Sequence, residues 1–425
     1  MPQYLSPGVY VEEVEGGAKP IAGLGTSTAG FIGQVADNVT MPPQPGKFEV
    51  DSLGNPVLDS QGNPIPIPYD VAVAGEAQLI TNWEEFKNKF GDIQVGNEML
   101  AHAVYGFFNN GGTRCWVTRV PDLTEDTTAS PAIDQVEDAL AEFEAIDEIA
   151  IVAVPMPTDV GEGNDASNLA RRVAVRGMVL SHCENAGDRF AILDGEETVS
   201  GALIPDGIYS NAAGNAMGMT SDYGAVYFPW IDVSGTGDFV PPCGHIAGIY
   251  ARVDGSRGVH KAPANEGIRG ALGVKYRVSK AQHDGLNPDG INVIRQFDGT
   301  IKVWGARTIG GDANTEWKYV NVRRLFLFLR ESIDEGTQWV VFEPNTPDLW
   351  AKITRNVTAF LTVVWRDGAL FGSAPQEAFF VKCDAETNPP EIRDLGQVIT
   401  EIGVAVVKPA EFVIFRISQW AGPGS

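Results

Sequence analysis

Two residues that could belong to a hydrolytic site, Ser256 and His260, lie close together in the segment DGSRGVH. A serine activated by a histidine base is the central feature of many nucleophilic hydrolases. The segment lacks the G-x-S-x-G nucleophile elbow and any other triad signature. A hydrolase is therefore an alternative hypothesis, and it predicts a pocket in which side chains converge around Asp194, Ser256 or His260.

Histidine and cysteine side chains offer two possible metal sites, one at Cys243 and His245 and one at His182 and Cys183. Ligands that are adjacent or one residue apart, without a distant second pair, form a poor tetrahedral site. The four cysteines contain no C-x-x-C pair, so they predict neither a disulfide framework nor a cysteine zinc site. We expect buried cysteines, and we predict no metal and no cofactor.

Paired carboxylates could act as general acid and base, and they occur at residues 12–13, 84–85 and 196–197. Neighbouring side chains on a helix or strand point in different directions. We therefore expect these pairs, Glu196 and Glu197 among them, to be solvated charges.

The glycines of AGLGTSTAGFIG resemble half of a dinucleotide fingerprint without its spacing, so this segment predicts a loop that enters a strand. The sequence thus predicts no catalytic residue.

Composition and charge limit the class of protein. The chain has 425 residues, of which 44% are hydrophobic and 20% are charged, as expected for a soluble protein of two or three domains. A net charge of -24 argues against a nucleic-acid partner, because phosphate binding needs clustered Lys and Arg. We find neither a signal-peptide pattern nor an apolar run of about 18 residues, so we expect cytosolic synthesis without membrane insertion.

The charge is unevenly distributed along the chain. Residues 1–260 contain 12 Lys and Arg against 36 Asp and Glu, whereas residues 261–425 contain 19 of each. Such an asymmetry is typical of two parts with different surroundings. We interpret the first part as facing water and the second as packed into an assembly, although an acidic domain that is merely soluble would give the same pattern.

The elements that would position these residues alternate between helix and strand up to residue 260. TNWEEFKNKFG predicts a helix, with a capping box formed by Thr81 and Glu84. Further helices are predicted around 100–108, 133–143 and 168–183, and strands at 114–120, 148–155, 189–194 and 224–230. This alternation is typical of βαβ units with a mostly parallel sheet. Within it, the Pro- and Gly-rich residues 41–70 predict an exposed hairpin-like insertion.

The pattern changes after residue 260. INVIRQFDGTIKVWGAR predicts a hairpin with its turn at Asp298 and Gly299. DLWAKITRNVTAFLTVVW predicts a long helix with one apolar face, and QVITEIGVAVV predicts a strand. The apolar face is formed by Leu349, Ile353, Val357, Phe360 and Val364.

Both ends of the chain contain a segment that predicts a strand. SPGVYVEEVEGG lies near the start and EFVIFRISQW near the end, and the second has apolar residues on both faces. A strand of this kind must be paired and covered, since an exposed edge invites aggregation. It can pair within its own subunit or complete the sheet of a neighbour.

Many long motifs, in order along the chain, resemble the contractile tail sheath proteins of phages and phage-tail-like injection systems. They are GVYVEE, GLGTSTAGFIG, FFNNGGTRCWVTRV, INVIRQFDGTIKVWGART, EWKYVNVRRLFLFL, VFEPNTPDLW, FFVKCDAETNP and KPAEFVIFRISQ. The insertion at residues 41–70 and the compact middle depart from the pattern, so the outer surface is not inferred from the family.

The resemblance implies a structural subunit, not an enzyme, that polymerises as six-fold rings in a helix around an inner tube and contracts to drive the tube through a target envelope. It implies an N-terminal arm (1–20), an outer acidic α/β domain with a subtilisin-like fold (21–260), an inner mixed α+β assembly domain (261–408) and a C-terminal arm (409–425). The arms would exchange strands between subunits. The matching arm residues are Val9, Tyr10, Val11, Glu12, Val14, Phe412, Val413, Ile414, Phe415 and Ile417.

The expected partners are other copies of the chain, the inner tube, baseplate and cap proteins, and sister sheath proteins. The particle, assembled in a bacterial cytoplasm, would be a phage virion or a phage-tail-like particle. Lys352, Arg355 and Arg366 lie on or near the polar side of the predicted helix, as a contact for an acidic tube or simply as a solvated face. A static fibre or binding module is the second alternative, and it would form a monomer or a polymer of one length.

Overall fold

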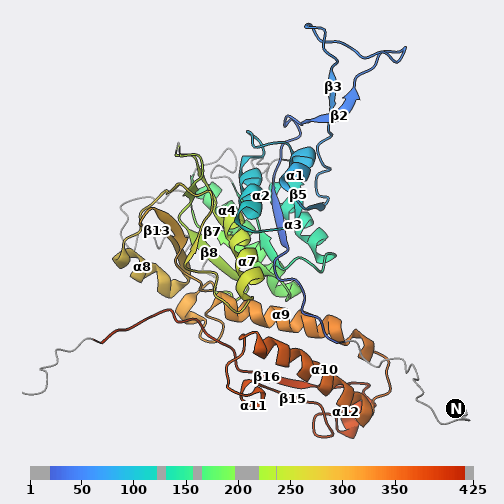
Figure 1. Ribbon diagram of the computed structural model, residues 1–425, viewed down its shortest axis with the longest axis vertical. Helices are drawn as coiled ribbons and strands as arrows, with labels where there is room; N and C mark the ends of the chain where they lie inside the picture. Colours follow the sequence, from blue (N-terminus) through green and yellow to red (C-terminus); the bar gives the residue numbers. More distant parts are fainter. Residues whose placement is uncertain (1–19, 122–130, 157–164, 197–219, 236, 417–425) are drawn as a thin grey trace, which may run out of the picture. The chain divides into compact units, whose positions relative to one another are not determined.

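A computed structural model of the protein describes residues 20–121, 131–156, 165–196, 220–235 and 237–416 (Figure 1). The chain divides into two compact units, which we describe separately. The α/β unit comprises Gly25–Phe328 and Val407–Ser425, and the two-strand unit comprises Met1–Leu24 and Leu329–Val406. The expected domain boundary near residue 260 falls inside the α/β unit, because strands on both sides of it share one sheet.

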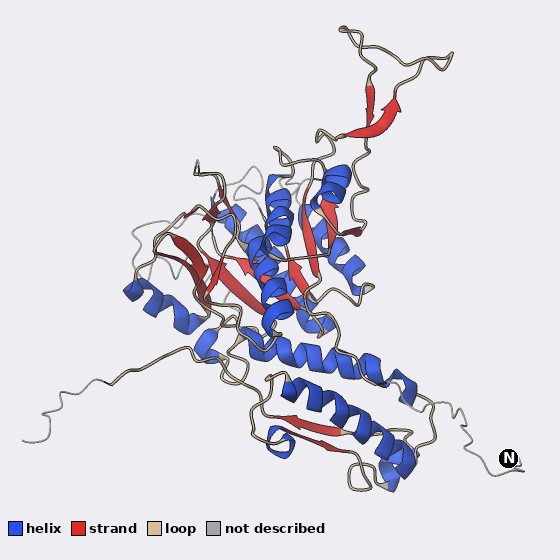
Figure 2. Ribbon diagram, in the orientation of Figure 1, coloured by secondary structure: helices blue, strands red, loops and turns tan. Residues whose placement is uncertain are grey.

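A nine-stranded sheet forms the centre of the α/β unit (Figure 2). Six adjacent strands are parallel, in the order β13-β8-β7-β6-β1-β5, and three antiparallel strands extend the edges. The parallel strands are β1 (Ala29–Gln34), β5 (Cys115–Val120), β6 (Ile151–Ala153), β7 (Phe190–Asp194), β8 (Gly224–Phe228) and β13 (Ile291–Phe297). The antiparallel strands are β4 (Gln78–Ile80), β14 (Thr300–Val303) and β11 (Glu266–Gly267). The predicted α/β class is confirmed.

Helices cover both faces of this sheet, which explains why its strands are apolar on both sides. One core cluster joins the strands to α1 (Trp83–Phe90), α2 (Glu98–Asn110) and α7 (Cys243–Arg257). A second cluster joins them to α3 (Pro131–Glu144) and α4 (Asp165–Ala186). Phe31 belongs to the first cluster and its neighbour Ile32 to the second, as strand alternation requires.

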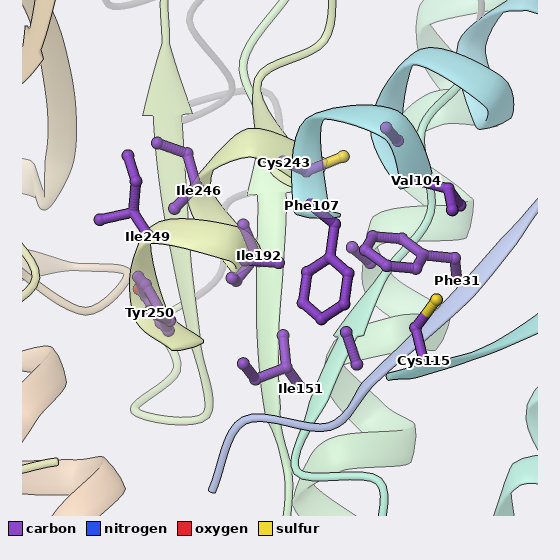
Figure 3. Packing of buried hydrophobic residues seen from close by; sticks show 14 of the residues in the cluster. Phe31, Val104, Phe107, Cys115, Ile151, Ile192, Cys243, Ile246, Ile249 and Tyr250 are labelled. Carbon is purple, nitrogen blue, oxygen red and sulfur yellow. The ribbon is translucent and has the colours of Figure 1, made fainter. Parts of the chain in front are cut away.

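The closest helix packing joins α2 and α7 (Figure 3). A Cβ atom at Gly244 would lie 2.2 Å from the carbonyl oxygen of Ala103, and one at Gly248 would lie 2.4 Å from that of Phe107. The two backbones therefore approach each other as only glycine allows. Phe107 in turn packs edge-on against Phe31 of β1, with ring centroids 5.5 Å apart. This packing fixes α7 on the sheet.

The insertion at residues 41–70 forms a hairpin of β2 (Pro43–Phe48) and β3 (Pro66–Pro68), as predicted. Its tandem DSLGNP and DSQGNP segments form two matching turns. Asp51 Oδ1 accepts hydrogen bonds from two backbone N–H groups, and Asp59 Oδ1 does the same eight residues later. Aspartate often stabilises turns in this way.

Local sequence signals predicted the turn between β13 and β14 and the start of α1. Asp298 and Gly299 form the turn between β13 and β14 with φ of 45° and 82°, as the predicted Asp-Gly hairpin requires. The N-cap of α1 lies one residue later than predicted, and the glutamate that would complete a capping box bonds to the residue before the N-cap. Asn82 is the N-cap and accepts from the N–H of Glu85, whose carboxylate bonds back to Thr81.

Shorter elements complete the α/β unit. A three-stranded sheet consists of β9 (Ile231–Asp232), β10 (Phe239–Val240) and β12 (Gly273–Val274). Helix α8 (Lys280–Leu286) begins with a capping box of Ser279 and Gln282 and leads into a 3-10 turn at Asn287–Asp289. A second 3-10 turn lies at Gly311–Ala313, before α9 (Val320–Thr337).

The two-strand unit contains the end of α9, a 3-10 turn at Gln338–Val340 and the long helix α10 (Pro347–Arg366). Its strands are β15 (Phe379–Lys382) and β16 (Glu401–Val404), which pair in antiparallel fashion, and α11 (Pro375–Ala378) and α12 (Pro390–Asp394) complete it. Helix α10 packs against β15. The five residues of its predicted apolar face are all buried, so that prediction is confirmed. In the described part of the chain, no helix combines the length and apolarity needed to cross a membrane.

Candidate assembly surfaces

The C-terminal segment that was predicted to be a strand is not paired with another strand among the described residues. Residues 412–416 carry no regular secondary structure, and β16 ends at Val404. Phe412, Val413, Ile414 and Phe415 nonetheless leave 68–84% of their surface exposed. Four consecutive large apolar side chains in water are an unstable surface, and they favour burial against another strand. Ile417 lies outside the described residues.

The N-terminal arm residues Val9, Tyr10, Val11, Glu12 and Val14 also lie outside the described residues. The segment that follows them is held by α9 in the two-strand unit. Ile21 packs so closely on Gly336 that a Cβ there would lie 2.7 Å from its side chain. The N–H of Leu24 donates to Ser332 Oγ at 3.1 Å.

The sheet formed by β15 and β16 is small and unfinished. Phe379 pairs with Val404 and Lys382 with Glu401, and no third strand among the described residues joins either edge. Phe380 on β15 and Ile402 on β16 are exposed. Helix α10 packs against this pair of strands, and the edges of a two-stranded sheet can accept additional strands through backbone hydrogen bonds.

Helix α10 presents a basic surface opposite its buried face. Arg355 and Arg366 are exposed and Lys352 is half-buried. Their spacing of three and eleven residues places them on one side of an α-helix. None of the ion pairs between described residues includes them.

The chain matches two consecutive phage tail sheath domains, described as the central domain over residues 132–309 and the C-terminal domain over residues 312–419. Together these matches span about two thirds of the chain. The structure also matches the helical sheath of the anti-feeding prophage in its contracted state, with a TM-score of 0.71 and 29% identity over 97% of this chain and 99% of that one. The chain belongs to the phage tail sheath family.

Three further relatives support this assignment of the sheath chain. The contracted sheath of an extracellular contractile injection system, PVC, matches with a TM-score of 0.71 and 27% identity over 99% of both chains. The tail sheath protein of Vibrio phage KVP40 is 29% identical over 42% of this chain and 26% of its own length, and that of Escherichia phage P2 is 24% identical over 45% and 47%. The alignments thus span about a quarter to a half of these phage proteins.

The sheath family is a structural one, and the residues of the alternative hydrolase site do not converge. Ser256 Oγ donates to the carbonyl oxygen of Arg252 at 2.7 Å, which is a hydrogen bond within α7. Asp194 Oδ1 accepts from the backbone N–H of Cys243 at 2.7 Å, at the other end of the same helix. An α-helix rises about 20 Å over this interval. The convergent pocket that a hydrolase would need is therefore not formed by this serine and aspartate.

The cysteine and histidine pairs of the sheath chain are core residues. Burial is the main cause that lowers the pKa of His245 to about 3 and raises the pKa of the Cys183 thiol. The ring of His245 fills the space above Gly106 on α2. Among the described residues, no three His, Cys, Asp or Glu side chains are grouped so that they could hold a metal ion.

The prediction that Glu196 is a solvated charge is wrong. Its carboxylate is buried, and it forms ion pairs with Arg172 at 2.7 Å and Arg176 at 2.5 Å. The two arginines lie one helical turn apart on α4, so they face the end of β7 together. Two arginines at this spacing on a predicted helix were the available signal for a buried acidic partner. Glu197 lies outside the described residues.

Proposed function

We propose that this chain is the subunit of a contractile sheath, which polymerises helically around an inner tube and contracts to drive that tube through a target envelope. The observation that carries the proposal is the match, over nearly the whole of both chains, to two sheaths of injection systems in the contracted state. Another matched structure is the baseplate of the anti-feeding prophage, which supports a baseplate as a partner. A phage virion or a phage-tail-like particle, either released or membrane-anchored and assembled in a bacterial cytoplasm, is the setting that we propose.

We further propose that neighbouring subunits are linked by strand exchange through both arms. Two features of the chain support this. The apolar residues 412–415 are exposed, and β15 and β16 have open edges among the described residues. Residues 9–14 and 412–417 would add to this sheet in adjacent copies. Since each joint would consist of backbone hydrogen bonds to a strand of a neighbour, the lattice could stay connected while the folded units repack.

The radial arrangement is a further proposal. The excess of acidic residues lies before residue 261, and we place residues 21–260, with the subtilisin-like fold implied by the family resemblance, outward toward solvent. Residues 261–408 would then lie inward, with Lys352, Arg355 and Arg366 toward an acidic tube surface. Opposite charges on two surfaces favour their association in the correct orientation.

Electron microscopy of the purified chain tests the proposed function. We expect the full-length chain to form long tubes, in the contracted arrangement when no tube protein is present. A chain without residues 1–17 should remain soluble and unpolymerised, with an unchanged melting temperature, because a strand that is lent to a neighbour adds nothing to the core of its own subunit. A lower melting temperature with tubes still present would show instead that the arm pairs within its own subunit.

A further inference from the structure

Near the start of the C-terminal arm, the carboxylate of Glu411 is held by four hydrogen bonds from the α/β unit. Glu411 accepts from Arg307 Nε at 2.8 Å and from Arg307 Nη2 at 2.9 Å, one to each carboxylate oxygen. Asn287 Nδ2 donates to it at 2.7 Å and Tyr319 Oη at 2.9 Å. The next four residues are exposed, so the chain passes from a fixed to an exposed segment between Glu411 and Phe412.

Arg307 is positioned for this contact by the core of the unit. The buried side chain of Asn292 on β13 holds its backbone, accepting from the N–H of Arg307 at 2.7 Å and donating to its carbonyl oxygen at 2.8 Å. The guanidinium Nη1 donates to the carbonyl oxygen of Asn287 and to Asp312 Oδ1. The Nε and Nη2 groups therefore point to Glu411 in the planar fork that suits a carboxylate.

The surroundings favour the charged form of Glu411. Burial by itself raises the pKa of this carboxyl group, but hydrogen bonds from Arg307, Asn287 and Tyr319 outweigh burial and lower it overall. Only 20% of the Glu411 side chain and 3% of the Arg307 side chain are exposed. A bidentate, largely buried pair of this kind is more specific in its geometry than a surface ion pair.

We infer that Glu411 is the fixed root of the C-terminal arm, held by Arg307, Asn287 and Tyr319 so that only the residues beyond it move to reach a neighbouring subunit. This inference rests on the proposed strand exchange. The arm is rooted in the α/β unit, although the residues just before it, up to Val406, belong to the two-strand unit. The fourteen residues after Glu411 reach about 45 Å when extended. A link formed by this arm thus joins the α/β unit of one chain to the sheet of another.

A pair of spin labels on the full-length chain measures whether the root is fixed. The four native cysteines are buried, so cysteines introduced at Arg416 in the arm and at Lys280 on α8 can be labelled selectively. Both positions are exposed and lie in the α/β unit. Pulsed EPR on soluble, unassembled chain gives the distribution of distances between the labels, and electron microscopy of the same chain gives the concentration at which tubes form.

Glu411→Gln removes the charge with little change in shape, and Glu49→Gln removes an exposed charge from the insertion as the matched control. We expect Glu411→Gln to widen the distance distribution at least twofold and to raise the assembly concentration about tenfold, with Glu49→Gln unchanged in both. If Glu411→Gln does not fold, Tyr319→Phe, which deletes one hydroxyl donor, takes its place in the experiment. We expect a smaller change in the same direction.

Two results would overturn the inference. One is an unchanged distance distribution in Glu411→Gln, which would mean that the carboxylate does not hold the arm. The other is a widened distribution with unchanged assembly, which would mean that the root has no part in the lattice. If the unsubstituted chain forms no tubes, the proposed function fails, while the label distances still decide whether Glu411 fixes the segment.

Discussion

Glu196 lies in an environment that its sequence neighbours do not reveal. Two adjacent glutamates are typical of a solvated surface, yet Glu196 forms ion pairs with Arg172 and Arg176 of α4. Glu411 is a similar case, since Arg307 is 104 positions away in the sequence. Hydropathy and spacing describe local structure, and neither indicates which distant charge a carboxylate will meet. These two residues could therefore not be assigned from the sequence.

Removing the carboxylate of Glu196 should destabilise the subunit strongly. Glu196→Ala leaves two buried arginines without their partner, so we expect the free energy of unfolding to fall by about 3–5 kcal/mol. Glu137→Ala, at an exposed position on α3, should change it by less than about 0.5 kcal/mol. Urea denaturation of unassembled chain measures both values. If both variants change the free energy of unfolding by the same small amount, the charges of Arg172 and Arg176 do not depend on Glu196.

Asp194 should make stability depend on pH. Burial is the main cause that raises its pKa to about 7 from an ordinary value of 3.8. Between these values the folded chain keeps a proton that the unfolded chain has released, so stability falls as pH rises through the window from about 4 to about 7.

Asp194→Asn retains an oxygen that can accept from Cys243 and removes the titration. We expect the variant to gain stability relative to the unsubstituted chain between pH 5 and pH 8, as measured by denaturation at both pH values. If the variant and the unsubstituted chain differ in stability by the same amount at pH 5 and at pH 8, Asp194 does not have this role.

At the scale of elements, local chemistry predicted much of the fold. The helix and strand alternation, the Asp298-Gly299 turn and the apolar face of α10 are all present. Of the predicted strand at residues 411–420, residues 411–416 are not paired with a strand among the described residues, and residues 417–420 lie outside them. Its apolar pattern indicates that it is buried somewhere, but the pattern cannot say in which subunit. The strand that pairs with this segment therefore cannot be assigned from a single chain.

Two glycines of α7 should respond differently to an added methyl group, because only one of them lies in the contact with α2. Gly244→Ala places a Cβ against the Ala103 backbone, so we expect a loss of about 1–3 kcal/mol or more in unfolding free energy. Gly255→Ala, on the same helix with open space around it, should stabilise the chain by up to about 1 kcal/mol. Thermal denaturation compares the two. A stabilising Gly244→Ala would mean that the helices pack less closely.

At the scale of the whole molecule, the two arms are rooted in different units. The segment after the N-terminal arm is held by Ser332 and Gly336 in the two-strand unit, and Glu411 is held in the α/β unit. If both arms exchange strands, each subunit is tied to its neighbours through both units. A rearrangement of either unit would then be transmitted to a neighbouring subunit.

The basic side of α10 can be tested by co-assembly. Replacing Lys352 and Arg355 by Glu should leave empty sheath tubes intact and reduce the fraction that contains the inner tube, because an acidic tube surface would be repelled. Lys280→Glu on α8, which changes an exposed charge in the other unit, is the control. Electron microscopy counts filled and empty tubes. Unchanged filling in the double variant would rule out this surface as the tube contact.

The most direct test of strand exchange between sheath subunits is a cryo-EM map of the assembled tubes at a resolution that traces the backbone. We predict that residues 9–14 and 412–417 of each subunit lie beside β15 and β16 of other subunits and extend that sheet by backbone hydrogen bonds, with Glu411 still bound to Arg307 of its own chain. A map in which both segments fold back onto their own subunit, with β15 and β16 still a pair of strands, would contradict the account.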